Sequence, residues 1–166
     1  MNNRYRDMKK IFLIDANLCV GCRICENICS LTKERNSNPR LARIRIVKLE
    51  KEGVDMPSFC RQCVNPPCVK ACPSDAITKN PTGIVVVDEA KCIGCGKCLI
   101  ACPFGAITLH TERGTAIKCD LCEGSPKCVE WCPTHAIQYK EPLNVTTSKQ
   151  TDYVKKLART KTNMEV

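Results

Sequence analysis

The fold of this chain follows from one stretch, Cys92-Ile-Gly-Cys-Gly-Lys-Cys-Leu-Ile-Ala-Cys102-Pro103. Its cysteines follow the spacing C-x2-C-x2-C-x3-C, and a proline comes directly after them. Structural zinc sites use two separated Cys-x2-Cys pairs, which close four thiolates around a single ion. Three thiolates on consecutive turns of one loop surround a wider object, and this spacing is typical of a [4Fe–4S] cube. We therefore expect an iron–sulfur protein rather than a zinc protein.

The same arrangement of cysteines occurs four times. The first and third groups have identical spacing, whereas the second and fourth widen the middle gap to x4 and x5. The groups are Cys19, Cys22, Cys25, Cys29; Cys60, Cys63, Cys68, Cys72; Cys92, Cys95, Cys98, Cys102; and Cys119, Cys122, Cys128, Cys132. All 16 cysteines belong to one of them. Because every ligand position is cysteine, the sequence predicts four [4Fe–4S] clusters.

Other residues repeat with the cysteines, which indicates internal duplication. Three groups end in the phrase Cys-Pro-x-x-Ala-Ile, at residues 72–77, 102–107 and 132–137. Proline disfavours the helical region for the cysteine before it, so the phrase predicts the end of a short helix. The β-branched runs at residues 83–88 and 10–15 predict strands. Each unit then consists of a strand, a cysteine loop, a short helix and another strand.

The composition requires something other than a large apolar core to hold the chain together. Hydrophobic residues make up 43% of the 166 residues, but 16 of them are cysteines and aromatic residues reach only 4%. A disulfide scaffold needs an oxidising compartment and an export signal. The apolar run at residues 11–14 is too short for a signal peptide, and no run is long enough for a membrane helix. We expect a cytoplasmic protein without a membrane span, whose reduced cysteines bind metal.

The basic charge of the chain is mostly explained by the expected clusters. The formal net charge is +9, from 26 basic and 17 acidic residues. Four oxidised cubes, each with four thiolates, bring about −8. The holoprotein is then close to neutral, which argues against nucleic acid as a partner. The remaining basic patches, residues 33–51 and the tail around Lys155 and Arg159, are either solvated faces or docking surfaces for another subunit.

Nothing in the sequence points to catalysis by this chain itself. Nucleotide-binding and metalloprotease motifs are absent. The two histidines, His110 and His135, lie outside any recognisable catalytic constellation. His135 is either an ordinary loop residue or a hydrogen-bond donor to a nearby cluster. Asp120, Glu123 and Glu130 in the fourth group either lower the reduction potential of that cluster or are solvated surface carboxylates.

These motifs resemble the bacterial ferredoxin family, and more closely its four-cluster relatives. Those are electron-transfer subunits of the dimethyl sulfoxide reductase and formate dehydrogenase type. The resemblance covers residues 11–139 and implies nested ligand sets: Cys19, Cys22, Cys25 with Cys132; Cys119, Cys122, Cys128 with Cys29; Cys60, Cys63, Cys68 with Cys102; and Cys92, Cys95, Cys98 with Cys72. Spacing alone leaves this pairing open, because the separations from Cys72 to Cys92 and from Cys102 to Cys119 each suit a ferredoxin pair.

The resemblance also implies the fold class and the domain organisation. We expect an α+β, ferredoxin-like fold of two nested dicluster modules with short strands, short helices and long loops. The outer module comprises residues 1–35 and 113–140, and the inner module residues 56–112. A basic insert, residues 36–55, is predicted to form a hairpin around the alternating stretch 43–49. A basic C-terminal tail, residues 141–166, contains a predicted helix at 151–161 and is expected to dock a partner.

The expected function is electron relay, without catalysis by this chain. The resemblance favours a catalytic partner of the tungsten- or molybdenum-pterin type, first of all an aldehyde oxidoreductase-type enzyme, including related benzoyl-CoA reductase assemblies. Formate dehydrogenase, carbon monoxide dehydrogenase and hydrogenase complexes come second, and a flavin subunit or a ferredoxin would be the other redox partner. A free polyferredoxin carrier is an alternative function. A regulatory iron–sulfur sensor that binds nucleic acid is the alternative from another class.

Overall fold

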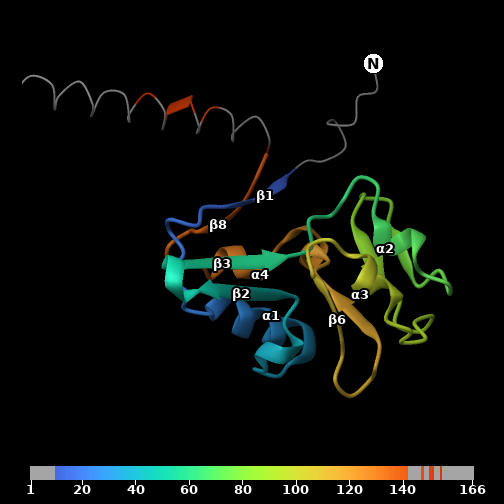
Figure 1. Ribbon diagram of the computed structural model, residues 1–166. Coiled ribbons are helices and arrows are strands. Elements are labelled where there is room, and N and C mark those ends of the chain that lie inside the picture. The colour runs from blue at the N-terminus through green and yellow to red at the C-terminus, as the bar shows by residue number, and fades with distance from the viewer. Residues whose placement is uncertain (1–9, 142–146, 148–149, 152–153, 155–166) are drawn as a thin grey trace, which may run out of the picture. The chain divides into compact units, whose positions relative to one another are not determined.

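The computed structural model describes residues 10–141 and the single positions 147, 150, 151 and 154 (Figure 1). The C-terminal tail, with most of its expected helix, therefore lies outside the described residues. Contacts divide the chain into two compact units: residues 14–138 form the larger one, and residues 1–13 with 139–166 form the smaller one.

The larger unit contains four helices, and each carries cysteines. They are α1 (Ile24–Glu34), α2 (Pro67–Lys70), α3 (Lys97–Ala101) and α4 (Lys127–Glu130). The third cysteine of each group lies on one of these helices. The fourth cysteine follows the end of the helix in three groups, where proline comes next, whereas α1 continues past Cys29, which no proline follows. The short 3-10 turns are η1 (Pro39–Leu41), η2 (Glu50–Glu52) and η3 (Leu121–Gly124).

Three antiparallel strand pairs surround these helices. Strand β2 (Ile44–Leu49) pairs with β3 (Val54–Phe59), β4 (Ile77–Lys79) with β5 (Val85–Val87), and β6 (Ile107–Leu109) with β7 (Ala116–Lys118). In the β2–β3 hairpin Ile44 is opposite Phe59, and alternate residues of β2 face the interior. The expected strand at residues 43–49 is thus β2. Its partner β3 begins at Val54 and runs past residue 55, where the insert was expected to end.

The repeated Cys-Pro-x-x-Ala-Ile phrase has one conformation at its three positions. The residue three after the cysteine has a positive φ in each case: 51° at Asp75, 57° at Gly105 and 55° at His135. This left-handed residue turns the chain, and the isoleucine two residues later begins β4, β6 or β8 (Ile137–Lys140). His135 is therefore first of all a turn residue, and its N–H donates to the Cys132 carbonyl at 3.2 Å.

In the smaller unit, aromatic packing joins the two ends of the described chain. Strand β1 (Ile11–Ile14) pairs with β8, and both strands cross the boundary between the two units. The rings of Phe12 and Tyr139 lie 5.2 Å apart between centroids, and the Lys10 ammonium lies 6.0 Å from the Tyr139 ring.

The apolar core of the larger unit is thin and is built around cysteines. One buried cluster consists of Cys68, Ile77, Val85, Cys98, Ile107 and Ala116. Within the described part of the chain, Phe59 is the largest side chain that is almost completely enclosed. Small and β-branched residues predominate in this cluster because cysteines, rather than large side chains, occupy part of it.

The residue before the second cysteine of each group is left-handed. The φ angles are 61° at Gly21, 49° at Gln62, 68° at Gly94 and 59° at Leu121. Glycine adopts this conformation freely, whereas an L side chain costs about 1–2 kcal/mol there. The four loops thus share one backbone path, and two of them maintain it against an unfavourable local preference.

Substitution of Gly94 should be more harmful than substitution of Gly96. Both have positive φ, but an added Cβ at Gly94 would lie 2.7 Å from the Gly114 carbonyl oxygen, whereas nothing lies within 4 Å at Gly96. We expect the G94A holoprotein to unfold in denaturant about tenfold faster than G96A, equivalent to about 1.4 kcal/mol. Circular dichroism measures the rates, and equal rates would contradict the close packing of the two loops.

Candidate metal centres

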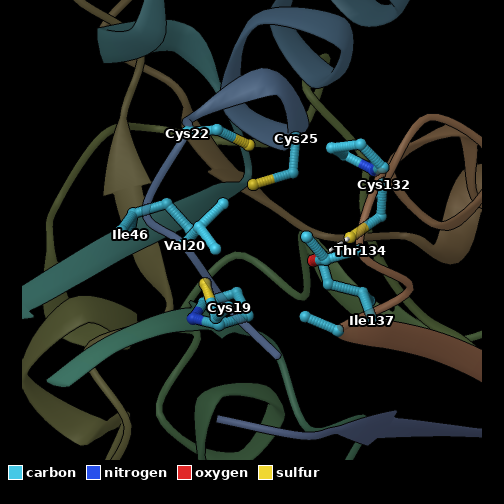
Figure 2. A pocket seen from close by; sticks show the side chains of 11 residues that line it. Cys19, Val20, Cys22, Cys25, Ile46, Cys132, Thr134 and Ile137 are labelled. Carbon is cyan, nitrogen blue, oxygen red and sulfur yellow. Dashed lines mark hydrogen bonds between the residues drawn. The ribbon is translucent and has the colours of Figure 1, made fainter. Parts of the chain in front are cut away.

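The first candidate centre lies between the cysteine loop before α1 and the turn after α4. Cys19, Cys22, Cys25 and Cys132 line one pocket of about 300 Å³, counting the open solvent at its mouth. Figure 2 shows these side chains around the hollow, together with Val20, Ile46 and Ile137. Three of the cysteines come from the first group and one from the fourth. We call this set site 1.

Two further pockets of the larger unit are likewise lined by four cysteines each. Site 3 is lined by Cys60, Cys63, Cys68 and Cys102, and its hollow measures about 320 Å³. Site 4 is lined by Cys72, Cys92, Cys95 and Cys98, and its hollow measures about 310 Å³. Each again combines three cysteines of one group with the fourth cysteine of another. Apolar side chains such as Ile107 in site 3 and Ile77 in site 4 complete the lining.

The remaining four cysteines are also close to one another. The charge of Cys122 acts on Cys29, and Cys119, Cys29, Cys122 and, least strongly, Cys25 of site 1 act on Cys128. We call the set of Cys29, Cys119, Cys122 and Cys128 site 2. It is enclosed, since Cys29 and Cys128 are buried and Cys119 and Cys122 are partly buried.

Neighbouring sites are linked in the order 1, 2, 3, 4. Sites 1 and 2 share α1, which carries Cys25 and Cys29 and packs against α4. Sites 3 and 4 share the contact between α2 and α3. The loops of sites 2 and 3 are joined by Gln62, whose side-chain amide donates to the Cys119 carbonyl oxygen at 2.7 Å, and the charge of Cys60 acts on Cys119. The two exposed cysteines, Cys22 and Cys95, belong to sites 1 and 4, which are the ends of this order.

Backbone N–H groups donate hydrogen bonds to the sulfurs. Ala76 N–H donates to Cys72 Sγ at 3.2 Å and Ala106 N–H to Cys102 Sγ at 3.5 Å, both within the repeated phrase. Arg43 donates to Cys29 and Ala116 to Cys92, both at 3.3 Å. Such donors stabilise negative charge on sulfur, so they favour thiolates and raise the reduction potential of a bound cluster.

Burial determines the acidity of the cysteines in the absence of metal. Burial, followed by the nearby Glu26 charge, raises the pKa of Cys25 to about 12, and burial raises the pKa of Cys119 to about 12. At Cys72 burial is outweighed by hydrogen bonds from Ser74 and from backbone N–H groups, so the pKa is lowered. Closely spaced buried thiols of this kind become thiolates when a cation binds, and binding then releases protons.

The donor sets fit iron–sulfur clusters. None of the 16 cysteines, all within the described residues, forms a disulfide. Across the described part of the chain, no three His, Cys, Asp or Glu side chains converge closely enough to hold a single metal ion. The sulfurs instead line hollows of similar size, with apolar walls and N–H donors behind them. Four thiolates around a hollow are the ligand set of a [4Fe–4S] cube.

The acidic residues of the fourth group differ in their surroundings. Asp120 accepts a hydrogen bond from the Lys33 ammonium at 2.6 Å and one from Cys122 N–H at 3.0 Å. Burial opposes ionisation of Asp120, but these contacts lower its pKa overall. Glu130 is exposed and pairs with Lys127 at 2.8 Å. Both carboxylates are thus compensated by a cation, and they add little net negative charge beside site 2.

An ionic network that is buried at Glu34 and exposed at Arg113 joins α1 to the turn between β6 and β7, and no sequence motif indicated it. Glu34 is 8% exposed, and its carboxylate pairs with Arg43 at 2.5 Å, Arg113 at 2.9 Å and His110 at 3.4 Å. Arg113 also reaches Glu89 at 2.9 Å. Burial alone would raise the pKa of Glu34, but the hydrogen bonds from Arg113 and Arg43 lower it to about 2. Three segments distant in sequence are connected through one carboxylate.

Comparison with known proteins gives one family match. The model of the 4Fe-4S dicluster domain matches residues 52–142. The chain is 47% identical over 85 residues to the polyferredoxin-like subunit of the aliphatic sulfonate oxidoreductase of Pyrococcus furiosus, which covers 51% of this chain and 49% of that protein. It is 35% identical over 88 residues to formate hydrogenlyase subunit 2 of Escherichia coli, covering 53% and 42%. The matches thus span about half or less of these relatives.

One solved structure is similar over most of the chain. It is the active site complex BamBC of benzoyl coenzyme A reductase with benzoyl-CoA, at 24% identity and a TM-score of 0.48, covering 90% of this chain and 96% of that one. This similarity is too low to support an argument about function. None of the described helices is both long and apolar enough to cross a membrane.

The Glu34 network should stabilise the protein by an amount that is independent of pH above about 5. E34Q removes a carboxylate that is 8% exposed and leaves Arg43 without its anion, so we expect a loss of about 1–3 kcal/mol. The folded pKa of about 2 is below the ordinary 4.5, so this contribution is complete above 4.5 and declines as the pH falls toward 2.

Denaturant unfolding of the holoprotein between pH 8 and 5.5 tests this expectation, with E50Q at an exposed position as the matched control. The difference between wild type and E34Q should stay constant over this range, and E50Q should behave like wild type. A difference that disappears by pH 6 would show that Glu34 is already protonated there.

Proposed function

This chain belongs to the 4Fe-4S dicluster domain family, and on that premise we propose that it relays single electrons through four [4Fe–4S] clusters to or from a catalytic oxidoreductase subunit. Electron transfer without catalysis agrees with the relatives, which include a polyferredoxin-like subunit and an electron transport protein. The observation that carries the proposal is the set of three pockets, each lined by four cysteines of which three come from one group and the fourth from another.

Each of the four sites is assigned one cluster in this proposal. The ligands are Cys19, Cys22, Cys25, Cys132 at site 1; Cys29, Cys119, Cys122, Cys128 at site 2; Cys60, Cys63, Cys68, Cys102 at site 3; and Cys72, Cys92, Cys95, Cys98 at site 4. The pockets support sites 1, 3 and 4, and mutual electrostatic influence supports site 2. Sites 1 and 2 form the outer dicluster module, and sites 3 and 4 form the inner one.

The residues of this chain set the conditions for electron transfer. When bound, each cube accepts or donates one electron. The thiolates hold it in place, the N–H donors of residues such as Ala76 and Ala116 offset the added negative charge, and the apolar lining excludes water. The exposed cysteines at sites 1 and 4 give partners access to the two ends of the series.

We favour a tungsten- or molybdenum-pterin enzyme of the aldehyde oxidoreductase type as the catalytic partner. The similarity to a subunit of an aliphatic sulfonate oxidoreductase supports an oxidoreductase as the partner, and the resemblance of the cysteine motifs favours the pterin type. A formate- or hydrogen-converting complex is the second choice, supported by the similarity to a formate hydrogenlyase subunit. Exposed apolar residues lie beside the end sites, such as Val20 at 62% and Ile93 at 68% exposure. Such residues fit a chain that is permanently docked to a partner better than they fit a free carrier.

The nested ligand assignment predicts which double substitutions are additive. If Cys22 and Cys132 bind the same cluster, C22A/C132A should lose one [4Fe–4S] cluster, as each single variant does. If Cys22 and Cys29 bind different clusters, C22A/C29A should lose two. Redox titration followed by electron paramagnetic resonance counts the remaining clusters, and wild type should contain about 16 iron atoms.

The opposite pattern, with one cluster lost in C22A/C29A and two in C22A/C132A, would mean that each group binds its own cluster. A wild-type content of about 12 iron and 12 sulfide, which corresponds to three cubes, would contradict the count of four.

Anaerobic purification from the source cells tests the partner. We expect the chain to co-elute with a larger subunit, and metal analysis of that complex to find tungsten or molybdenum beside iron. Iron with nickel would favour a hydrogenase or carbon monoxide dehydrogenase complex. A small iron-only monomer would refute the subunit function and leave a free carrier.

A further inference from the structure

A buried lysine lies where the outer and inner modules meet. Lys118, the last residue of β7, is 4% exposed. Its ammonium donates to the Val85 carbonyl oxygen on β5 and to the Cys119 carbonyl oxygen at 2.8 Å. Within the described residues, no carboxylate pairs with it, unlike Lys33 or Lys127. The positive charge of Lys118 is therefore not offset by a carboxylate of the described residues and acts on other neighbouring groups.

Lys118 is linked to two neighbouring sites, because it directly precedes Cys119 of site 2 and its hydrogen-bond partner Val85 lines site 3. Burial raises the pKa of Cys68 at site 3, and the charge of Lys118 acts in the opposite direction. Lys118 likewise opposes the effect of burial on Cys119 at site 2. A single ammonium thus acts on a ligand of each of the two neighbouring sites.

Gln62 completes this junction through hydrogen bonds to the same segments. Its side-chain amide donates to the Cys119 carbonyl oxygen at 2.7 Å and accepts from Val85 N–H at 2.8 Å. Its own N–H donates to Cys60 Sγ of site 3 at 3.5 Å. These contacts offset the left-handed backbone of Gln62, with φ of 49°. Gln62 thereby fixes the segments that hold the ammonium in position.

The physical consequence of this placement concerns reduction. A cube with four thiolates carries about −2 when oxidised and one more negative charge when reduced. In surroundings of low polarity, a nearby positive charge stabilises the reduced state more than the oxidised state. The reduction potential is then higher than it would be without that charge.

We propose that Lys118 is a positioning residue that raises the reduction potentials of the clusters at sites 2 and 3 together. The inference rests on the proposed function, because it assumes clusters at both sites. It adds a specific mechanism that keeps the two clusters at the junction between the modules easy to reduce. An electron that crosses from one module to the other then meets no large unfavourable change in reduction potential.

Removal of the charge tests the inference in the anaerobic holoprotein. In K118M we expect two of the four clusters to show at least a tenfold lower ratio of reduced to oxidised cluster at a fixed potential, which for a one-electron couple is a downward shift of about 59 mV. K118R, which keeps the charge, should stay within threefold of wild type. Redox titration with electron paramagnetic resonance gives the ratios, and iron analysis confirms four clusters.

The matched control is K79M. Lys79 also donates to a carbonyl oxygen beside a cysteine loop, that of Val64 at 3.3 Å, but it is solvent-exposed. Because water and salt screen an exposed charge, K79M should leave all four clusters unchanged. Equal effects of K79M and K118M would overturn the inference, as would unchanged potentials in a fully loaded K118M protein.

A second neutral variant covers the case in which K118M loses iron. K118Q retains a hydrogen-bond donor without the charge, and it should reproduce the selective shift at two clusters. Iron loss in both neutral variants, with full loading of K118R, would overturn potential tuning in favour of a purely structural role. A protein that holds four clusters with unchanged potentials would refute this inference while leaving the proposed electron relay intact.

Discussion

The structure depends on the gathering of four cysteine sulfurs around each hollow. Without metal, these are closely spaced thiols whose burial opposes ionisation, as the raised pKa values of Cys25 and Cys119 show. The short helices and three-residue strands around them would not be stable by themselves, because isolated elements of this length are marginal in water. Metal binding therefore supplies stabilisation that the thin apolar core cannot, and folding and cluster binding are coupled.

The repeated Cys-Pro-x-x-Ala-Ile phrase shows how one short sequence serves three structural purposes. Proline ends the helix, a left-handed residue turns the chain, and the isoleucine starts a buried strand such as β4. In two of the repeats the alanine N–H also reaches back to the cysteine sulfur. Alanine suits this position because its side chain is small enough to lie against the site, and Ala76 is 1% exposed.

The sequence predicted those parts of the molecule that depend on neighbours along the chain. The cysteine groups, the prolines and the β-branched runs led to the α+β ferredoxin-like fold and to the iron–sulfur chemistry. It did not predict contacts such as Lys33 with Asp120, which are 87 residues apart, or the convergence of Arg43, Arg113 and His110 on Glu34. Such pairs have no spacing rule, because they form only after the loops have been brought together.

The placement of the third and fourth cysteines has a mechanical consequence. Cys25 and Cys29 are four residues apart and belong to sites 1 and 2, and Cys68 and Cys72 link sites 3 and 4 in the same way. In α1 about one helical turn, with a pitch of about 5.4 Å, separates the two cysteines, whereas Cys72 lies just beyond the end of α2. Between sites 2 and 3 the connection is made by side-chain hydrogen bonds and by longer segments of chain. Within each pair of sites the chain itself sets the spacing of two cysteines, whereas between sites 2 and 3 the spacing depends on hydrogen bonds such as those of Lys118 and Gln62.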